Sequence, residues 1–202
     1  MLTGALVGLV VGVVMVIVRS VQGGNAFALF KQAMAARKTG GPAAGRAILE
    51  PKLKKGTIAR TAGLALIEDR EGIEAELAGM TDPVKHGFQR AFALFALAAL
   101  GDQRRLQEFD AVAERFEREA PKLWKIPREG LKDLKLMARV VGGAPSTEGD
   151  KARPDIAALR DPWAKLFLWD VTARGFERDG RTDVAANARM RTKGLDETRR
   201  AA

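Results

Sequence analysis

The chain has 202 residues, one histidine, no cysteine, no tyrosine and a net charge of +9. The absence of cysteine excludes a disulfide framework, a thiolate metal site and a thiol nucleophile. With a single histidine, few side chains titrate near neutral pH, so groups for proton transfer are scarce.

The first predicted element is the apolar stretch MLTGALVGLVVGVVMVIVRS. Met1 to Val18 contains no charged side chain, and Thr3 is its one polar side chain. A helix of this length spans about 27 Å, close to the ~30 Å hydrocarbon core of a bilayer. We predict an uncleaved transmembrane anchor over residues 1–20. A cleaved signal peptide and a buried soluble helix are the alternatives, although no basic residue precedes the run and no clear A-x-A site follows it.

Three glycines in this stretch, Gly4, Gly8 and Gly12, are spaced four residues apart. They fall along one side of a helix, where the backbone of a second helix can approach closely. The spacing predicts a helix-packing seam, with another copy of the chain or with a different protein. Glycine is also common in membrane helices, so the alternative is that these glycines are merely tolerated.

Most of the positive charge directly follows the predicted anchor. Arg19 to Arg60 carries +8, and the rest of the chain carries about +1. Because basic residues favour the cytoplasmic side, we expect the N-terminus outside and the rest of the chain in the cytoplasm. Residues 21–56 are expected to form a basic juxtamembrane segment near anionic lipid. The predicted lipid contacts are Arg19, Lys31, Arg37, Lys38, Lys52, Lys54 and Lys55.

Glycines and a short apolar stripe suggest the structure of this basic segment. Gly23-Gly24 predicts a helix end, with Asn25 capping the next helix. Residues 39–42, with the sequence TGGP, predict a second break. The helix between these breaks either lies in the membrane interface or packs on the core. The core is favoured because the apolar stripe is short, consisting of Phe27, Phe30 and Met34.

Residues 57–196 are predicted to form a domain of antiparallel helix pairs with breaks near residues 81, 101 and 180. Asp82-Pro83 and Asp161-Pro162 each place an N-cap residue before a proline suited to the first helical turn. The stretch GGAPSTEGDKARP at 142–154 predicts a loop. Residues 197–202 are expected to be a disordered tail.

The stretch ALFALAALGDQRRLQEFDAVAERFEREAP resembles a tetratricopeptide-type unit. The matching features are Leu100-Gly101-Asp102 at the turn, the alternating Phe109, Ala113 and Phe116, and the proline that follows. This resemblance implies an α-solenoid-like scaffold that binds proteins in a helical groove, without catalysis. The predicted fold class is all-α, with a transmembrane helix followed by a helical-hairpin domain.

The sequence offers no catalytic, cofactor or metal site. His86 has no second ligand at a metal-binding spacing. The acidic cluster Glu68, Asp69, Glu71, Glu74 and Glu76 is interpreted as a solvated helix face. Trp163, Phe167 and Trp169 share a helix with leucines and are expected in the core.

These features predict a membrane-anchored helical adaptor that binds another protein, and not an enzyme. One alternative is an accessory structural subunit of a larger membrane complex, held through the anchor. The other is a membrane-tethered nucleic-acid binder, which is less favoured because only Phe27 and Phe30 lie among the basic residues for base stacking.

Overall fold

The computed structural model describes the backbone of residues 2–192 and 195, and the side chains of residues 25–153, 155–192 and 195. The regular elements of this part are all helical, which confirms the predicted all-α class. In chain order they are α1 (Leu2–Leu49), α2 (Ile58–Leu66), α3 (Arg70–Gly79), α4 (Gly87–Ala99), α5 (Arg105–Glu119), α6 (Lys125–Val141), the 3₁₀ helix η1 (Ser146–Ala152), α7 (Arg153–Ala158), α8 (Pro162–Arg178) and α9 (Thr182–Arg191).

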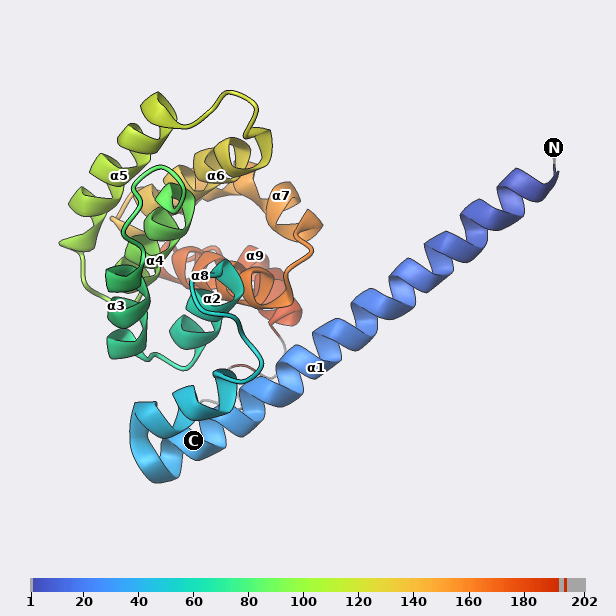
Figure 1. Cartoon of the computed structure of the whole chain (residues 1–202), viewed down its shortest axis with the longest axis horizontal. Coiled ribbons are helices and arrows are strands. Elements are labelled where there is room, and N and C mark those ends of the chain that lie inside the picture. Colours follow the sequence, from blue (N-terminus) through green and yellow to red (C-terminus); the bar gives the residue numbers. More distant parts are fainter. Residues whose placement is uncertain (1, 193–194, 196–202) are drawn as a thin grey trace.

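The long helix α1 runs from the N-terminus to the base of the domain (Figure 1). It passes through Gly23-Gly24 without interruption, so the predicted helix end there is wrong. Each glycine costs a helix interior about 1 kcal/mol. The packing of the residues that follow offsets this cost, because Phe30 and Met34 are buried against the domain.

The break predicted at residues 39–42 is confirmed. Gly41 has a φ of 74° and a ψ of −175°, and it divides α1 into a long first segment and a short second one. A positive φ is strained for residues with a Cβ atom, which explains the glycine. Pro42 begins the second segment, where a fixed φ and a missing N–H are tolerated. The chain therefore reverses direction here (Figure 1).

The apolar stripe of α1 forms part of the core, as predicted. Phe30 and Met34 are buried, and Phe27 packs against the core from a partly buried position. This part of α1 contacts α2 and α8.

Helix α8 is the central element of the domain. Its Phe167 ring meets the rings of Phe92 and Phe95 from α4, with centroids 5.9 Å apart in both pairs. Trp163 and Trp169 are buried in the same core, which confirms the prediction for this helix. Besides its neighbour α9, α8 packs against α2, so the first and last parts of the bundle are in contact.

The two predicted Asp-Pro helix starts differ in outcome. Asp161 caps α8 by accepting a hydrogen bond from the Ala164 N–H at 2.7 Å. Asp82 instead caps a turn that leads into α4, which begins at Gly87 rather than at Pro83. At Gly87 a Cβ atom would lie 2.4 Å from the Phe116 ring, so glycine permits the close packing of α4 against α5.

The breaks predicted near residues 101 and 180 are turns stabilised by glycine, whereas the loop predicted at 142–154 is mostly helical. Gly101 and Gly180 have φ angles of 105° and 69° and end α4 and α8. The predicted loop at 142–154 is partly wrong, because most of it is η1. The Asp179 carboxylate accepts a hydrogen bond from the Ser146 N–H at 2.6 Å, which fixes the start of η1 against the end of α8.

Candidate functional site

The basic segment and the acidic cluster contact one another inside the domain. Arg46 donates two hydrogen bonds to Asp69, from Nε to Oδ2 at 2.6 Å and from Nη2 to Oδ1 at 2.7 Å. The Asp69 side chain is fully buried and also accepts the Gly72 N–H, which caps α3. At the edge of this contact Arg37 binds Glu68 at 3.0 Å.

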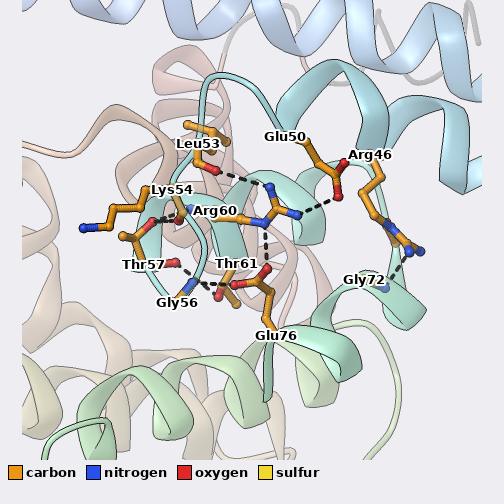
Figure 2. Close-up of polar contacts among 11 residues, drawn as sticks. Arg46, Glu50, Leu53, Lys54, Gly56, Thr57, Arg60, Thr61, Gly72 and Glu76 are labelled. Carbon is orange, nitrogen blue, oxygen red and sulfur yellow. Dashed lines mark hydrogen bonds and ion pairs between the residues drawn. The ribbon is translucent and has the colours of Figure 1, made fainter. Parts of the chain in front are cut away.

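A second ion pair lies deeper, around Arg60 of α2. Figure 2 shows its guanidinium surrounded by oxygens of Leu53, Glu50 and Glu76. Nε donates to Glu76 Oε1 at 2.7 Å, Nη1 to the Leu53 carbonyl at 3.2 Å and Nη2 to Glu50 Oε1 at 3.0 Å. The other Glu76 oxygen accepts the Gly56 N–H at 2.6 Å. These bonds fix the connection between α1 and α2 to the start of the bundle.

The interpretation of the acidic cluster as a solvated face is therefore wrong for two of its members. Asp69 and Glu76 are buried, because each neutralises an arginine from the preceding segment. The interpretation is confirmed for Glu71, whose side chain is 90% exposed. A basic segment followed by an acidic cluster was a signal for these contacts, but it did not identify which residues would pair.

The predicted lipid contacts occupy several places on the surface. Three lysines, Lys52, Lys54 and Lys55, are exposed together on the connection between α1 and α2. Lys31 is exposed on α1 and lies over the Phe27 ring, 4.9 Å from its centroid. Lys38 is also exposed on α1. Arg37 binds Glu68, which reduces the charge that it offers to a partner.

In the predicted anchor at residues 1–20, the structure describes the backbone from Leu2 on and does not describe the side chains. The side chain of Arg19 and the surroundings of the seam residues Gly4, Gly8 and Gly12 thus lie outside what the structure describes, as does the predicted tail at 197–202. Among the residues whose side chains the structure describes, no helix is both long enough and apolar enough to cross a membrane.

The connection between α5 and α6 forms an exposed apolar tip, which we define as residues 121–127, with the sequence PKLWKIP. Leu123 is 88% exposed and Ile126 83%, and Trp124 is 36% exposed. With Phe88 and Phe116, these side chains border a shallow depression of about 570 Å³. This surface was not predicted from the sequence, although Leu123, Trp124 and Ile126 in the five residues between two prolines were a signal for it.

The tip has a defined conformation. The Trp124 ring packs against the Phe116 ring, with centroids 6.2 Å apart. The backbone N–H of Trp124 donates to the Pro121 carbonyl at 3.0 Å. The Arg128 guanidinium donates to the carbonyls of Ala120 and Pro121. Leu123 and Ile126 are therefore exposed on a turn that is held at its base.

The described residues contain no group of three or more His, Cys, Asp or Glu side chains placed to hold a metal ion. His86 lies just before α4 and makes no capping hydrogen bond through its side chain. In α6, burial together with the nearby Asp155 and Glu129 carboxylates raises the pKa of Asp133 to about 6. Comparisons of the chain with protein-family models, with curated proteins and with solved structures give no match.

Proposed function

We propose that this chain is a single-pass membrane protein whose helical domain is an adaptor for another protein. The observation that carries the proposal is the continuity of α1. Its backbone is helical from Leu2 up to the kink at Gly41, and the same helix supplies Phe30 and Met34 to the core. The uncharged run before Arg19 would hold the domain at the membrane through this one helix.

The charge distribution supports an orientation for this anchor. The nine basic residues from Arg19 to Arg60 all follow the apolar run. By the positive-inside rule, the N-terminus lies outside and the domain in the cytoplasm. The exposed Lys52, Lys54 and Lys55 are available to anionic lipid on that side.

A groove beside α1 is the candidate docking surface of the adaptor. It has a volume of about 860 Å³ and lies between residues 25–32 of α1 and the start of α8. Small and apolar residues line much of it, among them Ala28, Leu29, Pro162 and Trp163. Polar residues, among them Gln32, Lys52 and Arg160, also line it, so this shallow groove suits an amphipathic partner helix. The groove follows the predicted anchor directly, so the partner would be held close to the membrane.

The predicted resemblance of α4 and α5 to a tetratricopeptide-type unit agrees with a scaffold role. In a linear repeat array, however, each unit contacts only its neighbours. The packing of α2 against α8 closes the bundle instead, so we place the docking surface on the outside of the bundle, at α1.

An accessory-subunit role is the second candidate, and the spacing of Gly4, Gly8 and Gly12 favours it. In that case the anchor itself would bind a membrane helix of the complex. Nucleic-acid binding loses support, because Arg46 and Arg60 bind carboxylates within the domain.

Recovery of partners by the tagged full chain in mild detergent tests the proposal. Ala28 is exposed in the groove, and the Ala28→Arg change places a charged side chain there without burying it in the core. The matched control is Ala35→Arg, at an exposed position of the same helix outside the groove. We expect Ala28→Arg to lower partner recovery by about tenfold or more, as for a central interface residue. The Ala35→Arg control should recover the partner like the wild type.

The same measurement separates the two candidates. If Gly8→Ile abolishes recovery while Ala28→Arg has no effect, the accessory-subunit role is supported and the groove is not the docking site. If neither variant changes the set of recovered proteins, both proposed contacts are wrong.

A further inference from the structure

We propose that the exposed apolar tip is a second membrane contact, which inserts Leu123 and Ile126 into the surface of an anionic bilayer. The contact would orient the helical domain on the membrane. This inference rests on the proposed function, because the anchor brings the tip close to a bilayer.

The first observation is a concentration of exposed apolar side chains. Four large hydrophobic residues are exposed in the part of the chain that the structure describes, and three of them are Leu123, Trp124 and Ile126. The fourth, Met190, lies alone on α9. Scattered exposed apolar residues are normal on a soluble surface, whereas a cluster indicates an interaction site.

The second observation is that the chain holds these side chains outward. The ring of Trp124 packs on Phe116 at the base of the tip, and Arg128 donates to two backbone carbonyls there. Leu123 and Ile126 point away from this support, with more than four fifths of each exposed. Protruding aliphatic side chains fit a fluid lipid surface, whereas small-molecule ligands bind in enclosed pockets.

The third observation is the charge around the tip. Residues 121–128 include Lys122, Lys125 and Arg128 and no acidic residue. Lys85 is exposed beside them and borders the same depression. Lysine is depleted in protein–protein interfaces, whereas it is attracted to anionic lipid headgroups. Tryptophan is enriched at the boundary between lipid and water. This combination favours an anionic bilayer over a protein partner.

The place of the tip in the fold is consistent with this contact. In Figure 1 the connection between α5 and α6 is at the top of the domain, and the turn within α1 is at the bottom. From that turn, α1 rises diagonally to the N-terminus at the upper right, so its far end and the tip both lie in the upper part of the view. A bilayer that holds the N-terminal part of α1 would thus lie on the side to which the tip points.

The absence of cysteine allows a direct test with the full chain. A polarity-sensitive fluorophore is attached at Ile126→Cys or, as the matched control, at Met190→Cys. Each labelled chain is reconstituted into phosphatidylcholine vesicles with or without phosphatidylserine. Resistance of the vesicle-bound chain to alkaline extraction reports the anchor, and quenching by nitroxide-labelled lipid chains reports the position of the probe.

With phosphatidylserine present, we expect a blue shift and strong lipid quenching of the probe at position 126, and neither effect at position 190. The double change Lys122→Gln and Lys125→Gln should weaken the quenching severalfold. If the chain resists extraction but the probe at 126 remains in water with both lipids, the second contact is wrong while the anchor stands. A protein partner would then be the better occupant of the tip.

If the chain is released by alkaline extraction, the anchor fails. The tip is then tested by adding the same vesicles to the chain in solution. Quenching at position 126 would support the contact without the anchor, and no quenching would overturn both.

Discussion

Arg60 and Glu76 form a buried ion pair that joins α2 to α3. The Arg60 Nε donates to Glu76 Oε1 at 2.7 Å, and the two side chains are 3% and 6% exposed. A buried ion pair costs desolvation energy, which is offset only when its other polar atoms are also bonded. Here the Leu53 carbonyl accepts a hydrogen bond from Arg60, and the Gly56 N–H donates one to Glu76. The pair therefore fixes the start of the bundle.

The first prediction concerns this pair. Glu76→Ala removes the buried carboxylate from the Arg60 guanidinium and leaves it with the half-exposed Glu50 and the Leu53 carbonyl. We expect this change to destabilise the domain by about 3 kcal/mol. Thermal unfolding of the full chain in mild detergent, followed by circular dichroism, measures the effect. The control is Glu71→Ala, whose side chain is exposed and which should stay within about 0.5 kcal/mol of the wild type. Equal unfolding temperatures for both variants would show that the pair is not structural.

The second prediction concerns the start of α8. Asp161 accepts the Ala164 N–H at 2.7 Å, and the helix it caps lies at the centre of the domain. Removing an N-cap side chain costs about 1 kcal/mol, so Asp161→Ala should lower the stability by this amount. Asp161→Asn keeps an oxygen acceptor and should lose less. The same unfolding experiment checks both variants, and an equal loss in the two would argue against a capping role.

The third prediction is a dependence of stability on pH. Burial and the neighbouring Asp155 and Glu129 raise the pKa of Asp133 from 3.8 to about 6. The folded domain thus binds a proton more tightly than the unfolded chain, and the contribution of Asp133 to stability falls as the pH rises from about 4 to about 6.

Asp133→Asn should remove this unfavourable charge. After allowance for solvent screening, we expect the variant to be about 1 kcal/mol more stable than the wild type at pH 7. The difference should nearly vanish at about pH 3, below the unfolded pKa of 3.8, where Asp133 is largely protonated in both states. Unfolding curves of the wild type and of Asp133→Asn, recorded at both pH values, measure the difference in stability. A difference that persists at the lower pH would assign the effect to something other than titration.

The fourth prediction concerns the glycine spacing in the predicted anchor. Gly8→Ile places a branched side chain at the centre of the seam, so it should weaken helix association while leaving membrane insertion intact. Gly8→Ala should have a milder effect, and Val10→Ile, away from the glycine line, should have little. Crosslinking in bilayers measures association of the chain with itself, and co-purification measures association with a partner. Unchanged association of Gly8→Ile would show that the glycines are only tolerated.

Local signals predicted most of the fold. The apolar spacing placed Phe109, Ala113 and Phe116 on the buried side of α5, and Asp161 marked the start of α8. Both depend on residues within a few positions of each other. The glycine pair at 23–24 was misleading because packing further along α1 decides whether the helix continues.

The surfaces of the domain were harder to predict than its helices. Arg46 and Asp69 are 23 positions apart, and only the folded chain shows that this basic residue meets this acidic one. The exposure of Leu123 and Ile126 was also missed. Leu123 and Ile126 are residue types usual in a core, and whether they face inward depends on how the connection between α5 and α6 is placed on the domain.

The orientation of the chain in the membrane is the central claim, and two single cysteines test it most directly. Thr3→Cys and Met190→Cys are each exposed in sealed cells to a thiol reagent that cannot cross the membrane, and the intact mass shows whether the N-terminus is retained. We expect an uncleaved chain in which position 3 reacts at once and position 190 reacts only after permeabilisation. Reaction at position 190 in sealed cells, or a mature chain that begins near Gly23, would contradict it.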